Sequence, residues 1–239
     1  MEQSALDGEE VEAGEIPREQ AVRLNTATIA DVLDALGVWG VLDHRIVPCS
    51  KGNPRFIGRA YTTRWAPARK GRSIVAVQPS TWSEVQGFLA PDVRDANGIV
   101  YVAGADDGLC TDYALAGGLS ATDFSQRGFA GVVLGGAIRD LHVVSQLPLP
   151  IRATNFTPAD TQGNYRVMES GGRCVIGRVT IETNDLVVAD ETGCVIIPNR
   201  IADKVISMAL TIESVEADMV DQLKRGERLF DIVNAVGRI

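Results

Sequence analysis

The sequence contains no uninterrupted run of 18 or more apolar residues, which a membrane-spanning helix would need. Its N-terminus is acidic and has no apolar core segment, so we do not expect a secretory signal. The four cysteines lack the Cys-x-x-Cys spacing of zinc and redox sites, and only two histidines occur, His44 and His142. These absences argue against a membrane protein, a zinc or histidine metal site and a disulfide framework, and they favour a cytoplasmic location.

Basic residues are also few. The 239 residues include 23 Lys and Arg against 31 Asp and Glu, which gives a formal net charge of -8 and a pI of about 4.9. Because binding to a phosphate backbone needs basic patches, we expect no nucleic-acid partner. The remaining composition, 45% hydrophobic and 23% charged, is that of an ordinary globular protein. We expect an acidic, flexible arm over residues 1–16 and one domain over residues 17–239.

Apolar patterning predicts alternating strands and helices. Thr28 and Asp31 have capping-box spacing at the start of a short helix that stops at Gly37. A helix is also predicted over 83–90, and apolar runs cover 73–77 and 110–116. Predicted strands cover 59–64, 99–103, 132–134, 173–182 and 186–190, the last of which forms a hairpin with 194–197. Strand, loop, helix and strand between 99 and 134 indicate a βαβ unit, and hence a parallel or mixed sheet.

A cation and an anion stand side by side where the predicted strand 132–134 runs out into a loop, after Gly135 and Gly136. The guanidinium of Arg139 can grip a carboxylate with two hydrogen bonds. The carboxylate of Asp140 offers hard oxygens that suit Mg²⁺ or Mn²⁺. The pair could therefore hold a metal-chelated oxo acid. The alternative interpretation is a surface ion pair that caps a turn, and this stretch alone leaves both open.

A second candidate segment precedes the helix predicted to start near Gly118 and to stop near Gly128. The first turn of a helix, here 118–121, points N–H groups outward that can bind an anion. If the βαβ crossover is right-handed, this turn and Arg139-Asp140 could face one crevice. Gly-Gly before a helix is often only a turn, so the glycines alone do not distinguish an anion-binding site from a plain turn.

Apolar residues recur every three or four positions from Ile201 to Met219, which predicts a long amphipathic helix ending at Gly226. Glu216 falls at the edge of the apolar stripe, where it is either a solvated acid or an acid held against a partner surface. Glu213 lies further out and is interpreted as solvated. In the hairpin, Asp190 is interpreted as serving the turn rather than the chemistry.

Four segments together carry a family resemblance: Leu24–Thr28 with Asp31 and Leu36-Gly37, Phe56–Thr62, Gly128–Val133 leading to Gly135–Asp140, and Asp185–Asp190 through Gly193 to Pro198. With these segments the chain resembles the RraA-like family over roughly residues 20–235. That family takes its name from the regulator of ribonuclease E activity A and includes the 4-hydroxy-4-methyl-2-oxoglutarate aldolases.

The resemblance implies an α/β fold with a central β-sandwich or barrel-like core flanked by helices, a single domain with a long C-terminal helix. It implies a homo-oligomer, a trimer or a hexamer. It also implies a divalent-metal-dependent lyase, using Mg²⁺ or Mn²⁺, that acts on a small-molecule 2-oxo acid. Retro-aldol cleavage of a 4-hydroxy-2-oxo acid and decarboxylation of oxaloacetate both give the enolate of pyruvate. Neither reaction requires a Schiff-base lysine.

The resemblance also implies residue roles. Arg139 would hold the substrate carboxylate and keto oxygen, and Asp140 would carry the metal, partly through waters. Backbone amides of the segment Gly117, Gly118, Leu119 and Ser120 would complete the carboxylate pocket. Glu216 would join the catalytic site from the C-terminal helix of a neighbouring subunit.

Two positions depart from the family pattern. Gly118 stands where active relatives have an acid, and Val143 stands where an acid is frequent, so a proton-transfer partner is missing unless Asp106, Asp107 or Asp112 replaces it. Three hypotheses follow: a metal-dependent lyase of the pyruvate-enolate type, a divergent member with another reaction on a carboxylate metabolite, and a non-catalytic regulator that binds an RNA-degrading enzyme.

Overall fold

The computed structural model describes residues 23–68 and 81–237. The predicted acidic arm and the apolar run 73–77 lie outside these residues. The helices are α2 (Thr26–Ala35), α3 (Trp82–Val85), α4 (Gly118–Gln126), α5 (Leu141–Val144), α6 (Ala202–Lys224) and α7 (Leu229–Val236), with 3₁₀ turns η1 (Gln86–Leu89) and η2 (Asn199–Ile201). None of the described helices is both long and apolar enough to cross a membrane.

Twelve strands are described, and most are short. They are β1 (Val47–Pro48), β2 (Phe56–Pro67), β3 (Ile99–Ala105), β4 (Cys110–Ala116), β5 (Gly131–Leu134), β6 (Gly136–Ile138), β7 (Ile151–Ala153), β8 (Tyr165–Ser170), β9 (Arg173–Ile176), β10 (Val179–Glu182), β11 (Leu186–Ala189) and β12 (Cys194–Ile197).

The long strand β2 organises the main sheet, whose order is β1-β7-β5-β3-β2-β11-β12, with β8 also paired to β2. Strands β2, β3, β5 and β7 run parallel, and β8 and β11 pair with β2 in the antiparallel direction. The chain between β3 and β5 passes through β4 and α4, which confirms the predicted βαβ unit and the mixed sheet. Two small sheets, β4-β6 and β9-β10, complete the fold.

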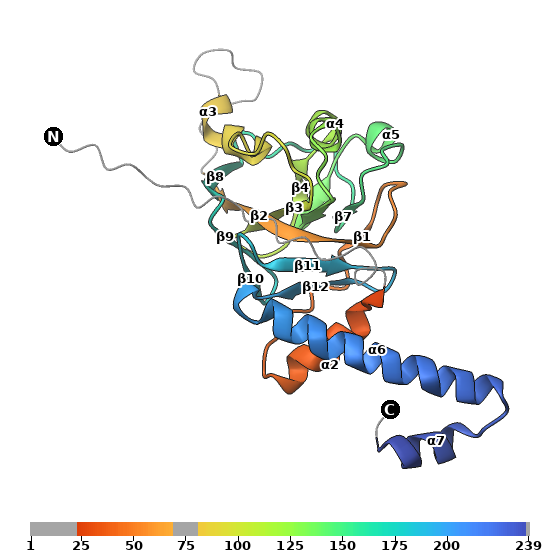
Figure 1. Cartoon of the computed structure of the whole chain (residues 1–239). Helices are drawn as coiled ribbons and strands as arrows, with labels where there is room; N and C mark the ends of the chain where they lie inside the picture. Colours follow the sequence, from red (N-terminus) through yellow and green to blue (C-terminus); the bar gives the residue numbers. More distant parts are fainter. Residues whose placement is uncertain (1–22, 69–80, 238–239) are drawn as a thin grey trace.

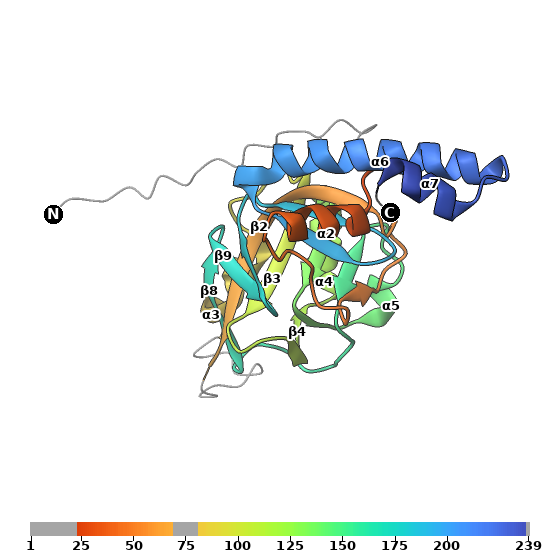
Figure 2. The ribbon, with the colours of Figure 1, turned by 90° about the horizontal axis from the view of Figure 1, so that it is seen from below.

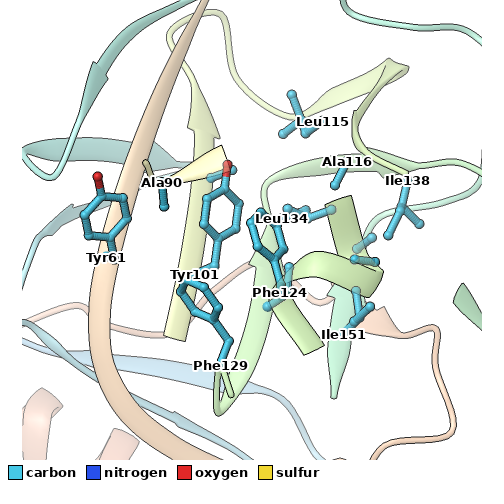
Figure 3. Close-up of a cluster of buried hydrophobic side chains, with 14 of the residues drawn as sticks. Tyr61, Ala90, Tyr101, Leu115, Ala116, Phe124, Phe129, Leu134, Ile138 and Ile151 are labelled. Atoms are coloured by element: carbon cyan, nitrogen blue, oxygen red, sulfur yellow. The ribbon is translucent and has the colours of Figure 1, made fainter. Parts of the chain in front are cut away.

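Helices cover the strands on two sides, so the molecule is layered (Figure 1). Alternate residues of β3 point to opposite faces, so Tyr101 packs in the cluster below α4 while Val100 and Val102 pack in a second cluster. The Tyr101 ring stacks on Phe124 of α4 at a centroid distance of 4.5 Å, and Phe129 closes the group (Figure 3). On the other side, α2 and α6 pack on β11 and β12. These layers confirm the predicted α/β fold.

Helix α2 begins at Thr26, two residues before Thr28. The predicted capping box of Thr28 and Asp31 is therefore wrong. Thr28 lies inside the helix and donates its hydroxyl hydrogen to Glu213 of α6. Asn25 donates from Nδ2 to both carboxylate oxygens of Glu213, at 2.9 and 2.8 Å. The expectation that Glu213 is solvated is also wrong, because the packing of α2 on α6 gives it these hydrogen-bond partners. Helical spacing within α6 alone does not reveal this packing.

The N-terminus of α2 is held instead by Asp190, from the turn between β11 and β12. Asp190 accepts hydrogen bonds from the backbone N–H and the hydroxyl of Thr26, both at 2.8 Å. It also accepts from the backbone N–H groups of Thr192 and Gly193, which confirms its predicted place in the turn. One buried carboxylate thus joins two segments 164 residues apart.

Other boundaries shift for identifiable reasons. The predicted helix over 83–90 is two short turns, α3 and η1, that end at Ala90 with a left-handed backbone. Strand β3 runs on to Ala105 because it stays paired with β2 as far as Trp65. The predicted strand 173–182 is a hairpin of β9 and β10, broken at Gly177, whose φ of +61° favours glycine.

Candidate functional site

Two segments that are distant in sequence meet at one end of the small sheet β4-β6. The strands are parallel, with Ala116 opposite Ile138, so the chain leaves both at the same edge. Gly117 and α4 follow β4, and Arg139 and Asp140 follow β6. The Arg139 N–H donates to the Ala116 carbonyl at 3.1 Å. The predicted crevice segments are therefore neighbours, as the carboxyl ends of parallel strands are.

Asp140 has an unusual backbone conformation, with φ +62° and ψ +48°. Aspartate tolerates this left-handed region better than most residues, and such conformations are concentrated at functional sites. Its Oδ2 accepts a hydrogen bond from the Gly118 N–H at 2.8 Å, at the positive end of α4. The Nε of Arg139 lies 3.6 Å from the same oxygen. The carboxylate is thus held in place and remains partly exposed.

Asp160 is an additional site residue that the sequence did not indicate. Its Oδ2 lies 2.5 Å from Nη1 of Arg139, and its Oδ1 accepts from the Gln162 N–H. It is more buried than Arg139 or Asp140. It lies in the irregular segment between β7 and β8, where no local pattern distinguishes a functional acid from a turn acid. Arg139 is therefore flanked by two carboxylates.

A cavity of about 470 Å³ opens beside these groups, within the usual size range of small-molecule sites. Arg139, Asp140 and Asp160 line it together with Gly117, Leu119 and Ser120 of the predicted carboxylate pocket. Gly118 contacts Asp140 but does not line the cavity among the described residues. The other lining residues are Trp82, Val85, Phe88, Leu89, Ala114, Leu115, Ala116, Asp123, Thr161 and Gln162.

The donor set fits an open metal site and not a closed protein cage. The described residues contain no group of three or more His, Cys, Asp or Glu side chains that could hold a metal ion. Mg²⁺ is usually bound through one or two carboxylates, with waters and substrate filling the other positions. Asp140, with Asp160 nearby, meets that requirement. Arg139, Asp140 and Asp160 carry a net charge of about -1 when all are ionised, which also favours a cation.

Two first-turn amides are already engaged. The Gly118 N–H donates to Asp140, and the Gly117 N–H donates to Oγ of Ser120 at 3.0 Å. An incoming carboxylate would therefore meet the amides of Leu119 and Ser120, or would take the place of Asp140 at Gly118. Helix α4 starts where the sequence predicts, and anion binding at its first turn stays a prediction, with part of the donor capacity used by the protein itself.

Gly118, the position of the missing family acid, is crowded by side chains. It starts α4 and is not among the described residues with positive φ, so backbone strain would not oppose a side chain. A Cβ there would lie 3.1 Å from Cβ of Val143 and 3.2 Å from Cβ of Asp140. The two departures, Gly118 and Val143, therefore face each other across the contact between α4 and α5. An acid at position 118 would need α5 to give way.

The three acids suggested as replacements do not line the cavity among the described residues. Asp107 accepts a hydrogen bond from the Tyr165 hydroxyl at 2.6 Å, and Asp106 lies 3.7 Å from Arg64. Asp112 accepts from the Thr157 hydroxyl through its backbone carbonyl. The acids that do line the cavity are Asp123, Asp140 and Asp160.

Glu216 is not brought to the cavity within one chain. It lies in α6, on the side of the sheet away from α4 and α5 (Figure 1). Its side chain is partly buried. The predicted role of Glu216 therefore requires a second copy of the chain, and it stays a prediction.

The mixed sheet, the long C-terminal helix and a carboxylate-lined cavity at the ends of β4 and β6 define an α/β protein with one candidate ligand-binding cavity among its described residues. The family model described as "RraA-like: Aldolase/RraA" matches residues 26–196. The chain belongs to this family, which confirms the family resemblance seen in the sequence.

Three relatives show how far the similarity extends. Protein DlpA of Legionella pneumophila is 26% identical over 213 residues, which cover 88% of this chain but 32% of that protein. A Pseudomonas paraeruginosa protein named "Putative 4-hydroxy-4-methyl-2-oxoglutarate aldolase" is 30% identical over 112 residues, covering 45% of this chain and 65% of the relative. The structure of Streptomyces coelicolor RraAS2, described as an unusual member of the RNase ES inhibitor RraA protein family, has a TM-score of 0.68 at 27% identity and covers 85% of this chain and 96% of that one. The chain thus spans about a third of DlpA and about two thirds of the named aldolase.

Proposed function

We propose that this chain is a divalent-metal-dependent carbon–carbon lyase that releases the enolate of pyruvate from a 2-oxo acid. The observation that carries the proposal is the arrangement of Arg139 and Asp140 beside the α4 N-terminus in a cavity of about 470 Å³. The Pseudomonas paraeruginosa relative supports it, because its name is that of a putative aldolase acting on a 4-hydroxy-2-oxo acid.

The residues have complementary tasks in such a reaction. The guanidinium of Arg139 would bind the substrate carboxylate and keto oxygen, where negative charge grows as the enolate forms. Asp140 would hold Mg²⁺ or Mn²⁺, and the ion would supply Lewis-acid stabilisation of the developing negative charge. Asp160 would orient the Arg139 fork through its 2.5 Å contact.

Charge explains why the metal would be needed for binding as well as for chemistry. Arg139 between Asp140 and Asp160 leaves a net charge of about -1, which repels a carboxylate. A divalent cation changes the local charge to about +1, which attracts it. Substrate affinity is therefore expected to depend on the metal, with little binding of oxo acids to metal-free protein.

The first prediction concerns a panel of 2-oxo acids. With Mg²⁺ or Mn²⁺, at least one 4-hydroxy-2-oxo acid or oxaloacetate should be converted to pyruvate, and a chelator should lower the rate about 100-fold or more. Pyruvate release would be followed with lactate dehydrogenase. The control is the same metal and substrate without protein, since free divalent ions decarboxylate oxaloacetate by themselves, and this background is subtracted at matched ionic strength. Equal turnover in the chelator would refute the metal role, and no turnover of any acid would favour the regulator hypothesis.

The second prediction concerns Glu216 and a shared site. If Glu216 enters the cavity of a neighbouring copy in a homotrimer or homohexamer, Arg139→Ala and Glu216→Ala proteins should each be inactive. After subunit exchange, mixed oligomers should regain activity, because some cavities then receive both intact residues. Exchange would be verified with differently tagged chains. The control mixes Arg139→Ala with Asp140→Ala protein, because these two residues lie together in one chain and no mixed cavity can receive both. If subunit exchange is verified and activity does not recover, Arg139 and Glu216 do not belong to one site across an interface.

A further inference from the structure

The cavity has two chemically different ends. Arg139, Asp140 and Asp160 form the polar end, where the reacting oxo acid group would lie. Trp82, Val85, Phe88 and Leu89 of α3 and η1 contribute an apolar wall. In two views at right angles, α3 lies on one side of α4 and α5 lies on the other (Figure 1 and Figure 2). A ligand held by Arg139 would therefore extend toward this wall.

The wall is anchored to the core and also open to a ligand. Val85 is fully buried, and the Phe88 ring lies 5.8 Å from the ring of buried Trp65. By contrast, Trp82 is 44% exposed and Leu119, on α4, is 91% exposed. These two large apolar side chains line the cavity from different elements. Exposed apolar surface at the rim of a cavity marks a place where an apolar group can bind.

The charges argue against a substrate with a second carboxylate. Among the described residues that line the cavity, Arg139 is the single cation, and three acids line it as well. Arg139 already faces Asp140 and Asp160. A second carboxylate directed at the apolar wall would meet no cation there, and the amides of Leu119 and Ser120 would replace only part of its hydration, which is costly. A substrate with one carboxylate and an apolar tail avoids this cost.

Resting on the proposed lyase function, we propose that the substrate is a 4-hydroxy-2-oxo acid with an aromatic or branched apolar group on C4, with Trp82 as a specificity-determining residue. In the reaction the bond between C3 and C4 breaks, and its electron pair forms the enolate across C2 and C3. The C4 hydroxyl gives up its proton to solvent water, and C4 becomes the carbonyl carbon of an apolar aldehyde. The enolate then takes a proton from solvent at C3 and leaves as pyruvate, so that no net proton is gained or lost. No oxidant or reductant is needed.

The third prediction compares two substrates that differ only on C4, one with a phenyl group and one with a methyl group. The wild-type protein should prefer the phenyl acid in kcat/KM by about 10-fold or more, in the range that apolar pockets achieve. Trp82→Ala should reduce this ratio about 10-fold, mainly by raising KM for the phenyl acid. Trp39→Ala, which removes a tryptophan that is 60% exposed and does not line the cavity, should leave the ratio unchanged. Leu119→Ser is a second variant on an exposed side chain, and it should also reduce the ratio.

Binding separates a wrong substrate class from a wrong reaction. Calorimetry with Mg²⁺ would compare 2-oxo-4-phenylbutanoate with 2-oxopentanoate, which carry phenyl and methyl on C4 but have no C4 hydroxyl, in wild-type and Trp82→Ala protein. Turnover of both C4 acids without preference, or a preference for a second carboxylate, would overturn the apolar substrate class and leave the lyase function standing. Tighter binding of 2-oxo-4-phenylbutanoate that is lost in Trp82→Ala, without turnover of either hydroxy acid, would support the apolar class and refute the reaction. If the protein neither binds these acids nor converts them, both the apolar substrate class and the lyase function are overturned.

Discussion

Replacing Asp140 by asparagine is expected to lower the metal-dependent rate by about 100- to 1000-fold, the loss typical of removing one group that stabilises charge in a transition state. Asparagine keeps the size of the side chain and tolerates the left-handed backbone, so the fold should survive. Its amide oxygen can still accept the hydrogen bond from Gly118. What it loses is the negative charge that would hold Mg²⁺ or Mn²⁺.

The measurement has two parts, kcat/KM for the best 2-oxo acid and Mn²⁺ affinity by calorimetry. Asp34→Asn, at an exposed acid of α2 far from the cavity, is the matched control and should change neither. Asp140→Asn protein with wild-type affinity for Mn²⁺ would rule out Asp140 as the ligand. Comparison with Asp160→Asn would then show whether the second carboxylate near Arg139 holds the ion instead.

Replacing Asp190 by alanine is expected to lower the free energy of unfolding by about 3 kcal/mol, because buried donors lose a charged acceptor. Four donors are affected, from Thr26, Thr192 and Gly193. Asp190→Asn should cost less, since its amide oxygen can replace Oδ1 and only the contact with the Thr26 N–H is lost. Denaturant midpoints would give these values, with exposed Asp31→Ala on α2 as the control.

The effect of Asp190 should also depend on pH. Burial alone would raise the pKa of this carboxyl, but hydrogen bonds from Thr26, Thr192 and Gly193 outweigh it and lower the pKa below its ordinary value. A carboxyl with a lowered folded pKa stabilises the protein above its unfolded pKa and loses that contribution as pH falls through the folded pKa. The stability difference between wild type and Asp190→Ala should thus be full at pH 7 and shrink below about pH 4. A difference that stays constant down to pH 2 would contradict this account.

The sequence predicts those parts of the fold that depend on local patterns. The buried strands β3 and β5 and the amphipathic helix α6 were predicted because apolar spacing reports directly on burial. Strand β8 was not predicted because its partner β2 lies about 100 residues away in the chain; helix α7 was also missed, although it packs on α6, which directly precedes it. The capping error at Thr28 and the error at Glu213 have one origin. Both residues bond to each other across α2 and α6, a contact of 185 residues' separation that no local pattern contains.

The candidate site divides in the same way. Arg139, Asp140 and the α4 turn could be named because each follows a recognisable strand end or helix start. Asp160 could not, because it belongs to an irregular segment and acquires its role only through contact with Arg139. The apolar wall was likewise not predicted: the helix predicted over 83–90 includes Val85, Phe88 and Leu89 but not Trp82. The place of this wall beside α4 depends on the tertiary fold and not on any local pattern.

The attachment of α2 also has a consequence for the order of events during synthesis. The ribosome makes Ile29, Val32 and Leu33 early, but these residues pack against β12 and α6, which follow more than 150 residues later. At about 5–20 residues per second, this apolar face waits roughly 8–40 s for its partners. The carboxylate that fixes the start of α2 also arrives late, at position 190. Helix α2, although made early, is therefore among the last elements to find its place, and a nascent chain halted before β12 would carry an uncovered apolar surface that chaperones could recognise.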